Sequence, residues 1–313
     1  MLSYIGRRIL AIIPIVLIVA VFVFAMLRLI PGDPALIIAG DSATPSQLEE
    51  IRGHMGLNKP IASQFLIWAE QVLHGDLGVS LHSRTPVLQM IRDRMGTTLA
   101  LALSTIIFST LIAVPLGVLA AWRRGTKVDR GIMAFSVLGF SVPIFVTGYA
   151  LILLFSMKLG WLPVQGYRQI SAGLLPFAQH LILPTVALST GFIALISRIT
   201  RSSILEVMGE DYIRTARAKG ITERVVMREH ALRNSAVPII TIIGISVGLL
   251  ISGVVVTESV FNLPGLGRLV IEAVLARDYP LIQGLILLFS LVYIGINLII
   301  DLLYVVFDPR IRY

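Results

Sequence analysis

The sequence predicts an all-α integral membrane protein with six transmembrane helices. Of its 313 residues, 56% are hydrophobic and only 14% are charged, and the mean hydropathy is +0.87; ordinary soluble domains have about 25% charged residues. The charges leave six runs free of Asp, Glu, Lys and Arg: Ile9–Leu27, Met95–Trp122, Gly131–Met157, Gln169–Ser197, Asn234–Thr257 and Tyr279–Ile300. Each run approaches or exceeds the roughly 20 apolar residues with which a helix crosses a bilayer.

The distribution of basic residues predicts the orientation of these helices. The first run is longer than a typical signal core and no small-residue cleavage site follows it before Pro31, so we expect a retained helix. Placing the N-terminus in the cytoplasm puts 16 of the 26 Lys and Arg residues on the cytoplasmic side, which is the side that basic residues favour. We therefore expect both termini to be cytoplasmic. The basic pI follows from this topology, so the expected partner is the lipid bilayer and not nucleic acid.

The connections divide the predicted chain into four parts. These are an N-terminal tip with the first helix (1–30), an extracytoplasmic helical loop (31–96), a five-helix core (97–307) with a cytoplasmic loop at 198–235, and a cytoplasmic tail (308–313). In the outer loop, Thr44-Pro45-Ser46-Gln47 has the pattern of a helix capping box. A second helix is expected from Pro60 to His74, before Gly75, and Thr85-Pro86 is expected to open a third that enters the second span. This loop could cap the helices or dock a partner.

The chain lacks the patterns of common catalytic and metal sites. None of its four lysines lies in a G-x-x-x-x-G-K-[ST] phosphate loop, and its five histidines show no metal-binding spacing. It has no cysteine and so no thiol chemistry. We therefore expect no catalytic site, no metal and no bound cofactor in this chain.

One apparent nucleophile pattern is better explained by helix packing. Residues 244–248, GISVG, match G-x-S-x-G, but that motif needs a strand–turn–helix context and this match lies inside a charge-free run. Gly244, Gly248 and Ser252 recur every four residues, and small residues at this spacing let another helix approach closely. We assign these three residues to a helix-packing face.

Few ionisable residues lie within the predicted spans, where such groups usually mark ion pathways. Asp301 lies inside the last helix near its cytoplasmic end, where we favour pairing with a basic loop residue over proton relay. Glu258 lies at a span end, where its side chain can reach the interface. Prolines at 14, 115, 143 and 184 interrupt spans, and we expect kinks there.

A charged insert occupies Asp211–Pro238, within the 38-residue cytoplasmic connection 198–235 and the start of the next span. Asp211–Lys219 predicts a short helix with acids at its start and bases at its end, as the helix dipole favours. Gly220 suits a left-handed C-terminal cap, and Thr222 is expected to cap a second helix anchored by Val225, Val226 and Leu232. Two capped helices exceed what joining two spans requires, so we expect a docking element for a cytoplasmic protein.

The insert resembles the cytoplasmic loop of type I ABC import permeases, in the branch that imports oligopeptides, dipeptides, nickel or glutathione. The family pattern is E-A-A, three residues, Gly, nine residues and I-x-L-P. Anchored on Gly220, this chain has Arg214-Thr215-Ala216 and His230-Ala231-Leu232-Arg233 instead, which is the variant of the peptide branch. Four further stretches resemble the first permease subunit of that branch: RLIPGDPA at 28–35, FNLPGLGRL at 261–269, RDYPLIQG at 277–284 and DPRIRY at 308–313.

The resemblance implies the type I ABC importer permease fold in a bacterial cytoplasmic (inner) membrane. It implies four kinds of partner: a second homologous permease that completes a heterodimer, two cytoplasmic ABC ATPase subunits that bind ATP and Mg, an extracytoplasmic substrate-binding protein, and the bilayer. The chain would form half of the pathway for peptides (dipeptide, oligopeptide or glutathione) or nickel, without a cofactor of its own.

The resemblance also implies which residues couple the chain to the ATPases. Gly220 would let the docking helix turn sharply, while Arg214, Arg217 and Lys219 would offer charge to the ATPase surface. The implied coupling residues are Asp211, Tyr212, Arg214, Thr215, Ala216, Arg217, Ala218, Lys219, Gly220, Glu223, His230, Leu232, Arg233 and Asn234.

Two other functions remain as alternatives. A proton-coupled secondary transporter of small solutes would need buried ionisable groups and would work without ATPases. A membrane enzyme would need clustered catalytic residues, which the sequence does not show. Uptake into vesicles that lack the ATPases separates the first alternative from the import permease.

Overall fold

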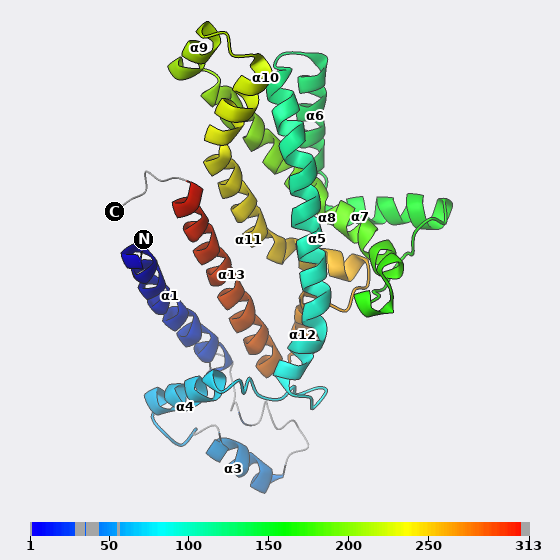
Figure 1. The fold of residues 1–313 in the computed structure, drawn as a ribbon. Coiled ribbons are helices and arrows are strands. Elements are labelled where there is room, and N and C mark those ends of the chain that lie inside the picture. The colour runs from blue at the N-terminus through cyan, green and yellow to red at the C-terminus, as the bar shows by residue number, and fades with distance from the viewer. Residues whose placement is uncertain (1, 29–34, 36–43, 55–56, 308–313) are drawn as a thin grey trace. The chain divides into compact units, whose positions relative to one another are not determined.

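The computed structural model describes residues 1–313 except 1, 29–34, 36–43, 55–56 and 308–313, and the described residues form helices and no strand (Figure 1). In chain order the elements are α1 (Leu2–Arg28), α3 (Pro45–His54), α4 (Ile61–Leu73), α5 (Val87–Trp122), α6 (Lys127–Ser141), α7 (Ile144–Leu151), the π-helix η1 (Ile152–Lys158), the 3₁₀ turn η2 (Ile170–Ala172), α8 (Leu174–Val207), α9 (Asp211–Ala218), α10 (Glu223–Val225), the π-helix η3 (Val226–Leu232), α11 (Ala236–Val260), α12 (Leu266–Leu275) and α13 (Tyr279–Phe307).

Four helices are long and apolar enough to cross a membrane: α5, α8, α11 and residues Tyr279–Leu302 of α13. They correspond to the second, fourth, fifth and sixth predicted spans. The first predicted span falls on α1, whose described apolar part, Leu10–Met26, is shorter than these four. The described residues thus contain four spans, or five if the bent pair below counts as one, and the expected sixth is not reached among them.

The third predicted span is interrupted at Pro143, where a kink was expected, but its two halves meet at a sharp bend. The chain bends by 102° between Lys127–Ser141 and Ile144–Lys158. The cause is Pro143, because the residue before a proline is pushed out of helical geometry, and Val142 is extended with φ −81° and ψ 124°. Pro14, Pro115 and Pro184 lie inside helices that continue past them.

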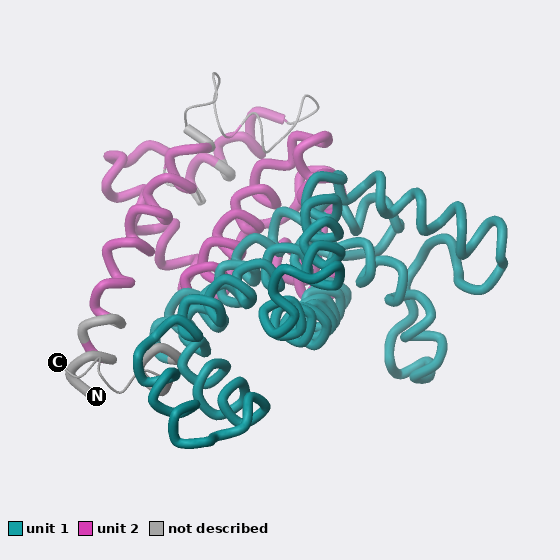
Figure 2. Tube along the Cα trace, turned by 90° about the horizontal axis from the view of Figure 1, so that it is seen from above, with its two compact units in different colours: residues 1, 97–267, 296–313 teal, residues 2–96, 268–295 magenta. Residues whose placement is uncertain are grey.

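The chain divides into two compact units, drawn in different colours in Figure 2. Unit 1 contains Thr97–Gly267 and the stretch from Ile296. Its core surrounds α8, whose most apolar stretch is 67% buried. Helix α8 packs against α6, α7 and α11. Small residues permit close approach: a Cβ on Gly117 of α5 would lie 2.6 Å from the Cβ of Thr200, and one on Gly253 of α11 would lie 2.6 Å from Leu188 Cδ1.

Unit 2 contains Leu2–Gly96 and Arg268–Gly295. Phe24 of α1 packs edge-on against Phe65 of α4 with ring centroids 5.3 Å apart, and Gln283 Nε2 donates to Val23 O at 2.7 Å. The buried carboxylate of Asp278 accepts from the Ser80 hydroxyl and from Leu81 N–H. These contacts join the start of α13 to the loop before α5 and to α1.

The expected local signals of the outer loop are present. Gln47 N–H donates to Thr44 Oγ1 at 3.4 Å and Thr44 N–H donates to Gln47 Oε1 at 3.0 Å, which is the predicted capping box. Helix α4 ends before Gly75, which has φ +83°, and α5 starts directly after Thr85-Pro86. Gly56 favours the end of the helix that the capping box begins, but it lies outside the described residues.

Candidate functional site

The candidate site is the connection between α8 and α11, which the sequence predicts to be cytoplasmic and which is built from α9, α10 and η3. Helix α9 has an acidic residue, Asp211, in its first turn and a basic one, Arg217, in its last, as the helix dipole favours. Its buried residues, Ile213 and Ala216, are three apart and so share a face. Together with Val226 they form a small core over Val207 and Met208 at the end of α8. Helix α9 is thus attached to the end of α8 by these buried apolar contacts, and its other residues are exposed.

Gly220 makes the turn that follows α9. Its φ is +77°, which is the left-handed conformation that the sequence predicted. The next residue closes the turn, because Ile221 N–H donates a hydrogen bond to Ala216 O at 3.3 Å. A Cβ placed on Gly220 would meet no atom within 4 Å. Backbone conformation, and not lack of space, is therefore what favours glycine here.

Arg217 and Glu223 face each other across this turn. Arg217 Nε donates to Glu223 Oε1 at 2.6 Å and Arg217 NH2 donates to Glu223 Oε2 at 3.3 Å. This hydrogen-bonded carboxylate raises the pKa of the Arg217 guanidinium. The Arg217 guanidinium is thus bonded within the loop in this conformation, and its expected role toward the ATPase surface stays a prediction.

The second helix of the insert differs from the prediction in three ways. Thr222 occupies the N-cap position, but its side chain makes no capping hydrogen bond. The helix widens after one turn into the π-helix η3, a form that is rare and occurs often at functional sites. Val225 is 44% exposed and is no anchor, whereas Val226 is fully buried. Leu232 is half-buried against Ala121, Ile204, Met227 and Ala231.

Tyr212 connects the two ends of the insert. Burial raises the pKa of its phenol, as does the nearby Glu210 carboxylate, while a hydrogen bond with Asn234 acts in the opposite direction. Asn234 Nδ2 in turn donates to His230 O at 2.7 Å. Tyr212 thus links the start of α9 to the residues that precede α11.

The remaining predicted coupling residues lie on the surface of the same connection. Arg214 pairs with Asp211 at 3.2 Å, but both side chains are largely exposed, so this pair contributes little. The Thr215 hydroxyl donates to Asp211 O at 3.1 Å. Ala218, Lys219 and Arg233 are exposed, and His230 is half-buried. The exposed face of α9 and its turn is thus polar and mostly basic.

The predicted packing face on α11 is present only in part. A Cβ on Gly244 would lie 2.6 Å from Ile300 Cδ1, so Gly244 does allow close approach of α13. Gly248 is half-buried, and Ser252 is exposed. Ser252 faces a cavity of about 430 Å³ at the bend between α6 and α7, lined also by Pro143, Thr147 and Thr190. The Ser246 hydroxyl is buried and donates to Ile242 O at 2.7 Å, so it is used within its own helix.

Besides Asp278, two further buried carboxylates were missed by sequence reasoning. Glu258 is fully buried, so the expectation that it reaches the interface is wrong. Its Oε1 accepts from Thr98 Oγ1 at 2.6 Å, and a Cβ on Gly265 would lie 1.9 Å from the same oxygen. Asp129, at the start of α6, pairs with Arg201 on α8. Two local signals were present in the sequence: the paired glycines of PGLG at 264–267, of which Gly265 packs against Glu258, and a Thr-x-x-Asp cap at 126–129, which contains Asp129. Neither signal identifies the partner of the carboxylate, because Thr98 and Arg201 are distant in sequence.

The comparisons with known proteins agree across the whole chain. Residues 113–313 match the family described as Binding-protein-dependent transport system inner membrane component, and residues 1–102 match its N-terminal family. A protein of Sinorhizobium fredii named Probable peptide ABC transporter permease protein y4tP is 51% identical over 310 residues, 99% of each chain. The Glutathione transport system permease protein GsiC of Salmonella choleraesuis is 44% identical over 313 residues, 100% of each chain.

A solved structure shows the same fold. The MetNI methionine ABC transporter, in inward-facing conformations, matches with a TM-score of 0.59 and 19% identity over 71% of this chain and 97% of that chain. At this identity the likeness concerns the fold alone.

Proposed function

The chain belongs to the family of binding-protein-dependent transport system inner membrane components, and from this premise we propose that it is a permease half of an ATP-driven peptide importer. The observation that carries the proposal is the α9–η3 connection, a compact polar element seated on the end of α8. The relatives named for peptide and glutathione transport support a cargo of short peptides, with glutathione among them. The chain is a multi-pass protein of the inner membrane.

The other components follow from the family. A second, homologous permease would complete the pathway, and an extracytoplasmic binding protein would deliver the peptide. Two cytoplasmic ATPases would hold ATP and Mg and dock on α9, whose exposed residues are polar and mostly basic. Both termini would lie in the cytoplasm. The permease itself would catalyse no reaction.

The geometry supports a mechanical role for α9. When the ATPases close on ATP, they would push on the exposed side of α9, whose buried side rests on the end of α8 through Ile213 and Ala216. Since α8 is the most buried of the four long apolar helices and contacts α5, α6, α7 and α11, a displacement there would reach these helices. The Arg217–Glu223 pair and the Gly220 turn would keep α9 and η3 together while the ATPases push on α9.

Uptake by the reconstituted complex tests the proposal. The complex with its binding protein is placed in vesicles and supplied with a labelled dipeptide or labelled glutathione. We expect uptake only when both ATPases and Mg-ATP are present, and no uptake with a non-hydrolysable ATP analogue. Uptake driven by a proton gradient in vesicles without the ATPases would instead support the secondary transporter.

The cargo is tested separately. The binding protein is purified from its host with the complex, and the small molecules that it retains are identified by mass spectrometry. Peptides or glutathione are the expected ligands. A binding protein that retains nickel and no peptide would contradict the peptide assignment while leaving the import function intact.

A further inference from the structure

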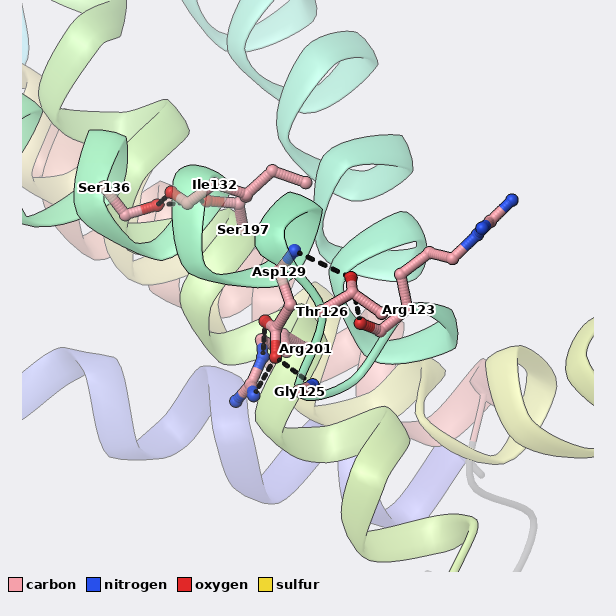
Figure 3. A network of polar contacts seen from close by, with 8 residues as sticks. All are labelled: Arg123, Gly125, Thr126, Asp129, Ile132, Ser136, Ser197 and Arg201. Carbon is pink, nitrogen blue, oxygen red and sulfur yellow. Dashed lines mark hydrogen bonds and ion pairs between the residues drawn. The ribbon is translucent and has the colours of Figure 1, made fainter.

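The structure shows a partly buried ion pair between Asp129 on α6 and Arg201 near the end of α8 (Figure 3). Arg201 Nε donates to Asp129 Oδ1 at 2.6 Å and Arg201 NH2 donates to Asp129 Oδ2 at 2.8 Å. The second oxygen also accepts from Gly125 N–H at 2.9 Å. The Asp129 side chain is only 5% exposed. Three donors on one buried carboxylate form a strong and geometrically specific contact.

This pair is one end of a continuous contact between the two helices. Further along, the hydroxyl oxygens of Ser136 on α6 and Ser197 on α8 lie 3.1 Å apart. Beyond them Gly139 faces Thr190, where an added Cβ would lie 3.2 Å from Thr190 Cγ2. The order of these contacts shows that the two helices are antiparallel. Polar contacts and small residues hold them together along most of α6.

The two ends of this fastened segment reach different functional regions. Arg201 lies on the last two turns of α8, which Gly209 and Glu210 join directly to α9. At the other end α6 stops at Ser141, where the span bends by 102° beside the cavity of about 430 Å³. The segment thus connects the docking element with the broken span.

We propose that Asp129 and Arg201 are positioning residues that make α6 move with α8, so that a displacement of α9 reaches the bend between α6 and α7. This inference rests on the import function proposed above and adds a route by which ATPase movement is transmitted to the pathway. Removing Arg201 leaves the buried Asp129 carboxylate without its counter-charge, and removing Asp129 leaves the partly exposed Arg201 without its bidentate partner. Either change frees α6 from α8 at the end nearest α9.

Two single variants and their double variant test the pair. Asp129→Asn and Arg201→Gln are each expected to lower the amount of peptide imported per ATP hydrolysed by at least about fivefold, measured per assembled complex, while ATP hydrolysis continues. Since each acts through the other, the double variant should be no worse than the poorer single variant. Arg198→Gln and Glu206→Gln, which remove exposed charges from the same end of α8, are the matched controls.

Two results would overturn the proposal. One is a peptide-to-ATP ratio in the single variants equal to that of the unaltered complex, which would leave the pair a purely structural role. The other is a double variant whose loss equals the product of the two single losses. Peptide import by the unaltered complex without ATPases would contradict the proposed function itself. That measurement is made on the unaltered complex, so its outcome is distinguished from a failure of the ion-pair proposal.

A crosslink provides a test that does not depend on how well the charge variants fold. The chain has no cysteine, so Ser136→Cys with Ser197→Cys introduces one pair at the point where the two hydroxyls meet. If α6 and α8 move together, oxidising this pair leaves uptake near its original rate and restores the peptide-to-ATP ratio of Asp129→Asn. Uptake that stops on oxidation and returns on reduction would show that the helices must separate, and would contradict the proposal. Each single cysteine variant, oxidised in the same way, is the control.

Discussion

Arg217 and Glu223 form a two-point ion pair that spans Gly220, with Nε–Oε1 at 2.6 Å and NH2–Oε2 at 3.3 Å. The last turn of α9 is thereby tied to the first turn of α10, and the left-handed glycine lies between them. Both side chains are partly exposed, so solvent screens the pair and its contribution to stability is small. Its main effect is to fix the angle at which α9 leaves the loop.

Charge reversal tests this tie. Arg217→Glu places two carboxylates together at the turn, and we expect about fivefold weaker association of the ATPases, which corresponds to about 1 kcal/mol. The membrane helices should stay folded, because an exposed pair contributes only about 0.2–1 kcal/mol. Adding Glu223→Arg should restore most of the binding. A double variant as weak as Arg217→Glu would show that Arg217 acts on the ATPase directly, as the sequence first suggested.

The close contact between Gly244 and Ile300 is tested by enlarging the side chain at position 244. Gly244→Leu inserts a side chain where a Cβ would already lie 2.6 Å from Ile300 Cδ1, and overpacking of this kind costs about 1–3 kcal/mol. We expect a lower Tm of the purified permease, partly recovered by adding Ile300→Ala. Gly295→Leu is the matched control, because a Cβ on Gly295 meets nothing within 4 Å. Equal losses from both leucine variants would exclude a specific contact.

The buried carboxylate of Glu258 predicts a requirement for a hydroxyl at position 98. Thr98 Oγ1 donates to Glu258 Oε1 at 2.6 Å and accepts from Leu266 N–H at 2.8 Å. Thr98→Val removes both bonds, and each lost partner of a buried polar group costs about 1–3 kcal/mol. We expect a clear drop in Tm for Thr98→Val and little change for Thr98→Ser. Identical Tm values for the two variants would contradict this role.

The proposed topology is tested by labelling in a chain free of cysteine. Ser83 and Lys127 are both exposed, and they precede α5 and begin α6, respectively. In intact cells an impermeant thiol reagent should modify Ser83→Cys and leave Lys127→Cys untouched, since basic residues concentrate on the cytoplasmic side. After permeabilisation both should react. The reverse pattern in intact cells would invert the topology.

Much of this architecture could be predicted because its causes are local. Charge-free runs mark α5, α8, α11 and α13, and the Thr44–Gln47 box and Gly220 each act on neighbouring residues in the chain. The proline at 143 was recognised as an interruption. The size of the bend was not predicted, because whether a helix kinks slightly or turns by 102° at a proline depends on the helices packed around it.

The features that sequence reasoning missed depend on contacts between distant segments. Asp129 and Arg201 are 72 positions apart, and Thr98 and Glu258 are 160 apart. Nothing in either local sequence distinguishes a buried carboxylate from one that reaches water. The same holds for Arg217, where charge at a helix end was recognised but its partner beyond the glycine was not.

Gly220→Val tests most directly whether the α9–η3 connection couples ATP hydrolysis to import. A β-branched residue at φ +77° is strongly disfavoured, so α9 should leave the loop at a different angle while the membrane helices still insert. Gly96→Val, at an exposed helical glycine with free space around it, is the matched control. The measurement is peptide uptake by the reconstituted complex, with ATP hydrolysis followed in the same vesicles. We predict that uptake is abolished in Gly220→Val, with ATPases that bind weakly or no longer respond to loaded binding protein. Uptake and stimulated hydrolysis equal to those of Gly96→Val would contradict the account and leave this segment a simple connector.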